Sequence, residues 1–203
     1  MKKILLGLLA ISAVSFAQKG DISIVPEYGI GFGAKYDDAP NVTDSTDGIG
    51  MSLSLESFYS LSDNFDLGLG VAYLKHADRK ESTFHSEKTS GAEYDSIPLY
   101  VSSKYYLTKG NTVDTFLKFN LGYAFNTKGT DYKSGGENYS TDIDNGLYWG
   151  LGGGIEYKNV VLDLMYTSTH SKVKVTGSGP AKGDSFDNNY GELTFSAGYK
   201  FNL

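Results

Sequence analysis

The sequence contains no cysteine, only four prolines and no long hydrophobic segment. Without cysteine, the chain has neither a lipid-modified N-terminal cysteine nor a disulfide framework. The longest apolar run, residues 4–14, is far shorter than the roughly 20 residues that a membrane helix needs, so no such helix is expected. The scarcity of proline, together with 25 glycines and 14% aromatic residues, favours an all-β chain.

The N-terminus has the pattern of a secretory signal peptide. Lys2 and Lys3 precede the apolar run, and Ser15-Phe16-Ala17 places small residues at −3 and −1 of a cleavage site. We therefore expect residues 1–17 to be a signal peptide cleaved after Ala17, and residues 18–203 to form one domain. Removal of the two lysines leaves 16 basic against 24 acidic residues, a net charge of −8, which argues against nucleic acid as a partner.

Eight segments alternate apolar residues with small or polar ones at a period of two, as β-strands with one apolar face do. In the first segment, the apolar face runs from Ile22 to Ala34, with Gly29, Gly31 and Gly33 on the other face. Each apolar face is about ten residues long, which is enough for a tilted strand to cross the hydrocarbon. A soluble β-sandwich shows similar alternation. The eight segments span residues 22–34, 49–61, 65–73, 97–107, 117–125, 147–157, 160–166 and 193–203.

The connections between these segments distinguish a membrane barrel from a sandwich, because long and short connections alternate. Long connections on one side and short turns on the other are typical of bacterial outer-membrane barrels with an even number of strands. In hydrocarbon an open sheet edge has no hydrogen-bond partner, so the eighth strand must pair with the first. The sequence thus predicts an all-β fold, an eight-stranded antiparallel up-and-down transmembrane β-barrel. Its connections are residues 36–47, 62–64, 77–93, 108–114, 127–144, 158–159 and 173–189.

Aromatic residues on the apolar faces gather near both ends of the strands, where interfacial anchors are expected. This placement predicts two aromatic girdles. The short-turn girdle comprises Tyr59, Phe65, Tyr105, Tyr157, Tyr199 and Phe201, and the long-loop girdle comprises Phe32, Tyr73, Phe125, Trp149 and Tyr166.

The last strand resembles the C-terminal β-signal that the barrel-assembly machinery reads. Phe195, Tyr199, Phe201 and Leu203 carry the likeness, with Leu203 where the signal favours Phe. Together with residues 96–100, 121–123 and 150–157, the chain resembles the small outer-membrane β-barrel family that includes OmpX, OmpW, the opacity adhesins and the OmpA transmembrane domain. The resemblance implies a Gram-negative outer-membrane location and contact with lipid and lipopolysaccharide. It names no activity, because fold alone does not supply one.

The polar faces carry ionisable residues that point into the lumen of such a barrel. Unpaired buried charges cost several kcal/mol, so these groups are expected to pair or to hold water. A structural salt-bridge plug is the simpler interpretation, and a gate that opens a pore, as proposed for the OmpA domain, is the alternative. Above this layer we expect a wet pocket that is open to the loop side, without a through-channel. The predicted lumen charge network comprises Glu27, Glu56, Asp66, Lys104, Lys118, Glu156, Asp163 and Lys200.

Catalysis and metal binding have weak support in the sequence. Ser168 and His170 share one strand face, as a lipid A-modifying pair would, but no carboxylate that would orient the histidine is identifiable. Residues 142–146 echo the start of a calcium loop, but Gly153 stands where its final acidic ligand is required. We therefore expect no enzyme activity, no cofactor and no metal.

The leading functional hypothesis is a monomeric, non-enzymatic surface protein. Its barrel would display four mobile loops for envelope integrity or for adhesion to a host or neighbouring cell. The alternative is a narrow, porin-like pore, or a lateral exit that transports small hydrophobic molecules. Lipid A modification is the remote third hypothesis.

Overall fold

The computed structural model describes residues 20–37, 44–80, 82–84, 87–89, 93–110, 112–127, 132–134, 137–176 and 185–203. The expected signal peptide lies outside these residues. In the part of the chain that is described, no helix is long and apolar enough to cross a membrane.

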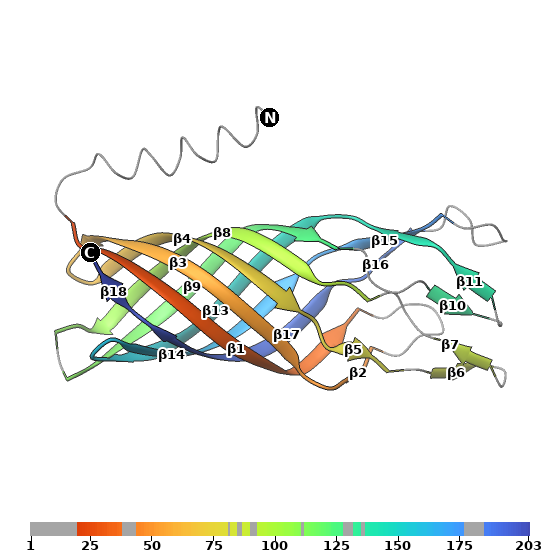
Figure 1. Ribbon diagram of the computed structural model, residues 1–203, viewed down its shortest axis with the longest axis horizontal. Coiled ribbons are helices and arrows are strands. Elements are labelled where there is room, and N and C mark those ends of the chain that lie inside the picture. Colours follow the sequence, from red (N-terminus) through yellow and green to blue (C-terminus); the bar gives the residue numbers. More distant parts are fainter. Residues whose placement is uncertain are drawn as a thin grey trace, which may run out of the picture.

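The eight barrel strands form one antiparallel sheet whose last strand pairs with the first. Each barrel strand pairs with the barrel strands that precede and follow it in the chain. β17 closes the cylinder by pairing with β1, for example Phe195 with Ile30. The predicted eight-stranded up-and-down barrel is therefore confirmed (Figure 1). The strands are β1 (Ile22–Tyr36), β3 (Gly50–Ser62), β4 (Phe65–Lys75), β8 (Ser96–Thr108), β9 (Val113–Asn126), β13 (Gly146–Tyr157), β14 (Val160–Thr169) and β17 (Tyr190–Tyr199), which β18 (Phe201–Asn202) continues.

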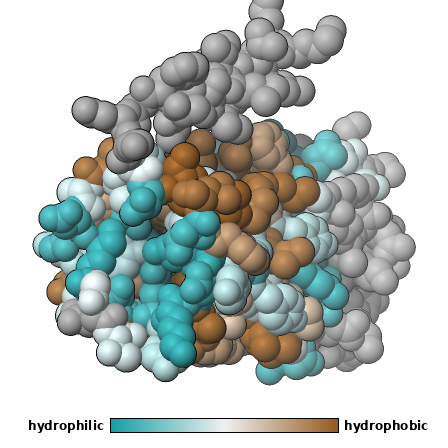
Figure 2. Space-filling view, turned by 60° about the vertical axis from the view of Figure 1, so that its left-hand side comes forward, coloured by the Kyte–Doolittle hydropathy of each residue, from teal (hydrophilic) through white to brown (hydrophobic). Residues whose placement is uncertain are grey.

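The barrel wall is apolar on the outside and polar on the inside, the reverse of a soluble protein. Leu53, Leu99 and Leu121 expose 61%, 54% and 47% of their surface, whereas Glu56, Lys104 and Lys118 expose 3% or less. Figure 2, which brings the short-turn end forward, shows hydrophobic side chains on the wall and hydrophilic ones gathered at that end. Every side chain of the two expected girdles lies on the outer surface, exposed or half-buried. The exposed belt requires lipid around it, so the soluble sandwich is excluded.

One residue in β1 reverses the predicted alternation. Gly33 has φ +62° and forms a β-bulge, because the pairing with β17 shifts by one residue between Phe32 and Lys35. After the bulge the even-numbered residues face inward, so Ala34 and Tyr36 are buried, and Gly33 has open space around it. The predictions that Ala34 faces outward and that Gly33 lines the lumen were wrong, because strict alternation cannot reveal a bulge.

The loop side carries further strands in regions that the sequence assigned to mobile loops. β2 (Thr46–Asp47) pairs with β5 (Asp78–Arg79), and β12 (Thr141–Ile143) pairs with β15 (Lys172–Val175), which pairs with β16 (Ser185–Asp187). These small sheets extend the barrel beyond the wall on the side opposite the short turns (Figure 1). Two hairpins lie there as well, β6 (Ser82–Phe84) with β7 (Glu87–Thr89) and β10 (Tyr132–Ser134) with β11 (Glu137–Tyr139).

Candidate functional site in the charged lumen

The short-turn half of the lumen is closed by a cation packed among aromatic rings. Lys104 Nζ lies 4.4 Å from the ring centre of Phe58 and 4.6 Å from that of Phe116. The same ammonium group binds Glu156 Oε1 at 3.2 Å, and the Tyr106 hydroxyl donates to that oxygen at 3.0 Å. Val25 and Val161 complete this buried cluster with Phe58, Tyr106 and Phe116. Aromatic side chains and an ion pair thus fill the barrel together at this level.

Two further lysines pair with acids at the short-turn end. Lys200 Nζ lies 2.9 Å from Glu156 Oε2, and Lys109 Nζ lies 3.1 Å from Asp66 Oδ1. The Ser60 hydroxyl also donates to Asp66 Oδ1, at 2.8 Å. Both acids therefore have at least one cation partner.

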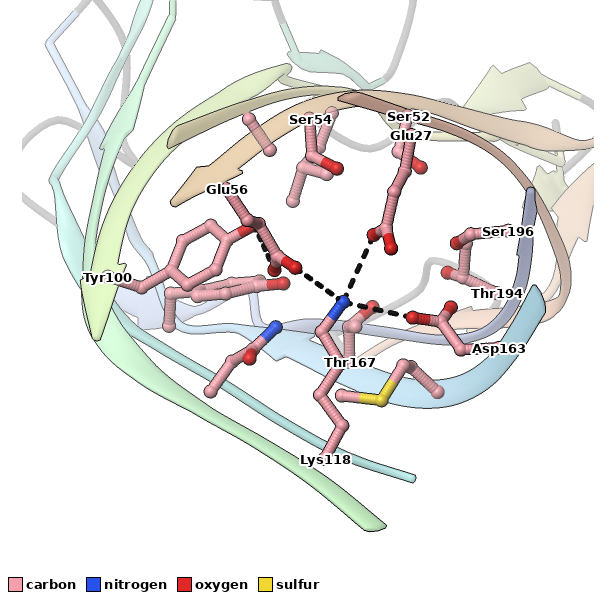
Figure 3. Close-up of a pocket in the computed structure, with 15 residues that line it drawn as sticks. Glu27, Ser52, Ser54, Glu56, Tyr100, Lys118, Asp163, Thr167, Thr194 and Ser196 are labelled. Carbon is pink, nitrogen blue, oxygen red and sulfur yellow. Dashed lines mark hydrogen bonds and ion pairs between the residues drawn. The ribbon is translucent and has the colours of Figure 1, made fainter. Parts of the chain in front are cut away.

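In the middle of the barrel, one lysine from β9 meets three carboxylates from three other strands. Lys118 Nζ lies 3.0 Å from Glu27 Oε2, 2.8 Å from Glu56 Oε2 and 2.9 Å from Asp163 Oδ2. Figure 3 shows these carboxylates pointing from the wall toward the ammonium group. All four side chains are at least 95% buried. Tyr100, from β8, donates to Glu56 Oε1 at 2.9 Å, so the group ties together β1, β3, β8, β9 and β14.

The central carboxylates lie beside a small polar cavity. Its volume is about 30 Å³, room for about two water molecules. Hydroxyl groups line it beside the acids, among them Ser52, Thr167 and Thr194 (Figure 3). The cavity therefore has the dimensions of a hydration site and is far smaller than a channel.

A further acid, Glu192, lies above the cavity and was missing from the predicted network. Tyr190 donates to its Oε2 at 2.8 Å, and Thr194 donates to its Oε1 at 3.3 Å. Gly31 and Gly50 make room for it, because a Cβ at either position would collide with the carboxylate. Alternation places Glu192 inward, but its bonded partners are uncharged, so no pattern of opposite charges indicates it in the sequence.

Outside the membrane, the loop side of the barrel is closed by an aromatic cluster around an arginine. The rings of His76 and Tyr190 stack at 3.9 Å, and the Arg79 guanidinium lies 4.5 Å from the centre of the Tyr36 ring. Arg79 Nη2 also donates to Asp37 O and to Asn188 Oδ1. Burial lowers the pKa of His76 to about 3, so the ring is neutral in the folded protein. We call Tyr36, His76, Arg79, Tyr94 and Tyr190 the loop-side cluster.

The eight residues of the predicted lumen network fall into two groups in the structure. Glu27, Glu56, Lys118 and Asp163 meet at the middle of the barrel, while Asp66, Lys104, Glu156 and Lys200 lie near the short turns. Four large side chains, Phe58, Tyr100, Tyr148 and Met165, are also buried in the lumen. Sequence reasoning missed Tyr106, Phe116, Val25 and Val161.

The residues considered for catalysis have other contacts. His170 Nε2 accepts a hydrogen bond from Trp149 Nε1 at 3.4 Å, and no carboxylate among the described residues bonds to it. Asp144, from the calcium-like segment, pairs with Lys174 at 2.6 Å. Within the described ranges, no group of three acidic or histidine residues is arranged to hold a metal ion.

Comparison with known proteins gives the fold a context. No protein-family model matches the sequence. A relative from Pasteurella multocida (strain Pm70), the uncharacterized protein PM1543, is 28% identical over a 243-residue alignment that covers 99% of this chain and 98% of the relative.

Solved structures of outer-membrane proteins share the fold at low sequence identity. OprG from Pseudomonas aeruginosa aligns with a TM-score of 0.52 at 14% identity, covering 90% of this chain and 96% of OprG. Ail of Yersinia pestis, solved in complex with the heparin analogue sucrose octasulfate, aligns at 0.50 and 14% identity, covering 91% and 100%. AlkL, solved in lipid bilayers, aligns at 0.50 and 17% identity, covering 91% and 92%.

Proposed function

Because this chain has the fold of the small outer-membrane β-barrel proteins, we propose that it is a non-enzymatic scaffold that displays loops at the cell surface. The observation that carries the proposal is the closed lumen. The aromatic cluster around Lys104 and the three carboxylates around Lys118 fill the barrel at two levels. The cavity beside Lys118 has a volume of only about 30 Å³. A barrel closed in this way supports display of the loops better than diffusion through the centre.

The loop side supports the same function, because it is built as a firm base. Tyr94 donates to Asn188 O at 3.0 Å, and the Ala77 amide donates to the Tyr190 hydroxyl at 3.0 Å, so segments far apart in the chain are joined. Function in such a protein belongs to the loops that a rigid scaffold positions. The loops would serve envelope integrity or contact with a host or neighbouring cell.

Loop exchange tests this function. Residues 177–184 are replaced by a short Gly-Ser linker, which leaves the loop-side cluster intact. Residues 110–112 at the opposite end are replaced as the matched control, which keeps Lys109 and its ion pair with Asp66. We expect the first exchange, and not the control, to reduce the binding of bacteria that carry the protein to host cells or to neighbouring bacteria. Alternatively, it should increase leakage of a periplasmic enzyme from those bacteria. If neither property changes with any of the four loops exchanged, the display function is wrong.

A second function, lateral exit of small hydrophobic molecules, is favoured by one break in the wall. The β4–β8 ladder pairs Val71 with Leu99 and next pairs Leu74 with Ser96, leaving two positions unpaired. Pro98 lies in this gap and lacks the amide hydrogen that a ladder needs. Outside the gap lies an apolar groove of about 390 Å³, and Ala72 lines both this groove and the lumen cavity.

A crosslink tests the lateral exit. The chain has no cysteine, so Ala72→Cys with Pro98→Cys, across the gap, allows one disulfide to be formed and reduced. If the seam opens, oxidation stops passage of a hydrophobic dye into vesicles that contain the barrel, and reduction restores it. A Leu69→Cys and Val101→Cys pair in the intact part of the same ladder is the control. Equal dye passage in both redox states of the first pair would reject the lateral exit.

The remaining assignments follow from this location and are also proposals. Residues 1–17 direct secretion, and the barrel-assembly machinery reads Phe195, Tyr199, Phe201 and Leu203. The girdles contact lipid and lipopolysaccharide at the two interfaces, and the barrel is a monomer.

A further inference from the structure

The middle of the lumen carries more negative than positive charge. Three carboxylates, Glu27, Glu56 and Asp163, surround the single ammonium group of Lys118, which leaves a net charge of −2 when all are ionised. Near the short turns, Lys104 and Lys200 share the single carboxylate of Glu156, and among the described residues neither forms an ion pair with the three central acids. Buried charge of this size needs a counter-charge to be stable.

Two of the carboxylate oxygens have no partner. Glu27 Oε1 and Asp163 Oδ1 are fully buried atoms without a hydrogen bond, although the other oxygen of each group binds Lys118 Nζ. The two side chains are 95% and 98% buried. Because Glu27 Oε2 and Asp163 Oδ2 both bind Lys118 Nζ, these two bound oxygens lie no farther apart than the sum of the two hydrogen-bond lengths. Both line the cavity beside Lys118 (Figure 3).

We propose that this cavity is a binding site for a hard inorganic cation. Its lining offers carboxylate and hydroxyl oxygens, the ligands that Ca²⁺, Mg²⁺ and Na⁺ prefer, and neither histidine nor cysteine. Its volume of about 30 Å³ admits an ion with a water molecule and excludes a bulky organic cation. A divalent ion matches the excess charge best, so Ca²⁺ is the first probe.

The ion has two direct carboxylate ligands in this site. No three acidic groups of the described residues converge on one metal position, and Lys118 already holds one oxygen of each acid. Glu27 Oε1 and Asp163 Oδ1 therefore bind the ion. The hydroxyls of Ser196 and Thr194, together with water, complete its shell. The cation then neutralises the acids that Lys118 leaves uncompensated and fastens β1 to β14 across the lumen.

Thermal unfolding of the refolded mature chain tests the site. The midpoint is measured in a zwitterionic detergent with CaCl₂, with NaCl or with choline chloride at equal ionic strength, choline being too large for the cavity. At 100 times the dissociation constant, Ca²⁺ or Na⁺ should raise the midpoint on the order of 5 °C above that in choline. Glu27→Gln and Asp163→Asn should abolish this rise. Asp66→Asn, a buried acid outside the cavity, should retain it.

Terbium luminescence provides a second measurement that needs no acid to be removed. Tb³⁺ in a calcium site is excited by nearby tyrosines, and Tyr148 lines the cavity. Tyr148→Phe should lower the luminescence that CaCl₂ displaces, whereas Tyr123→Phe, on the lipid-facing side, should not. The proposal is overturned if no inorganic cation shifts the native midpoint relative to choline. It is also overturned if the midpoint shift persists in both Glu27→Gln and Asp163→Asn, or if Tyr148→Phe leaves the Ca²⁺-displaceable luminescence unchanged.

Discussion

Replacement of Lys118 by methionine is the sharpest test of the lumen, because it removes one charge and keeps a side chain of similar length. Lys118 binds three carboxylates and is 97% buried. Loss of one partner from a buried ion pair costs about 3–5 kcal/mol, because the other charge is left uncompensated. With three acids left behind, we expect the free energy of unfolding to fall by at least about 3 kcal/mol.

Lys200→Met is the matched control. Its ammonium forms an ion pair with one acid, Glu156, which keeps Lys104 and the Tyr106 hydroxyl as partners, and it also donates to the Tyr106 hydroxyl at 3.4 Å. The Lys200 side chain is also 18% exposed, so solvent screens its charge in part. Its replacement should cost about 1 kcal/mol or less.

Urea unfolding in lipid vesicles measures both variants, with Trp149, the single tryptophan, as the fluorescent probe. A second substitution, Asp163→Asn, should restore part of the stability that Lys118→Met removes, because it deletes one of the stranded charges. If Lys118→Met and Lys200→Met cost the same, the central group contributes no more than a surface pair, and the electrostatic reasoning for the lumen is wrong.

Three further changes test other parts of the structure. Gly33→Ala should cost about 1–2 kcal/mol of unfolding free energy, because φ is +62° there, and Gly33→Asn should cost less, since Asn tolerates that region; equal costs would contradict the bulge. His76 has a pKa of about 3 in the folded state and 6.5 in the unfolded state. The neutral, buried ring therefore contributes its full share of the folding stability above pH 6.5, and this share is lost as the pH falls toward 3. The difference in stability between the native chain and His76→Phe should therefore change by at most about 1.4 kcal/mol per pH unit below pH 6.5, and a constant difference between pH 7.5 and 5 would show that His76 is not buried as described. Tyr106→Phe deletes a buried hydrogen bond to Glu156 and should cost about 1–2 kcal/mol in urea unfolding without creating ion conductance in planar bilayers; open-channel currents would refute the closed lumen.

The barrel was predictable from the sequence because the pattern that produces it, an apolar face at a period of two, recurs in eight segments of the chain. Each strand places apolar residues outward at a period of two, and the connection lengths alternate, so eight separate segments give the same answer. The inward direction of Lys104, Lys118 and Glu156 follows from the same alternation. Which charges meet does not follow from it, because that depends on strand register and on the reach of each side chain.

The parts that sequence reasoning missed are set by single residues or by distant contacts. One left-handed glycine, Gly33, reverses the phase of β1 and turns Tyr36 into the loop-side cluster. That cluster joins residues from four separate segments of the chain, so no local sequence pattern predicts it. Tyr106 and Phe116 look like any strand aromatics, and only their inward register makes them part of the plug.

The central claim is that the apolar face of each strand touches lipid while the polar face is enclosed in a closed cylinder. Spin labels on single cysteines introduced at each position from 117 to 125 in β9 test it most directly, because the chain has no cysteine of its own. We predict that oxygen, which concentrates in lipid, reaches labels at Leu117, Phe119, Leu121, Tyr123 and Phe125 far better than labels at the positions between them. Accessibility without a period of two, or with the opposite phase, would contradict the account.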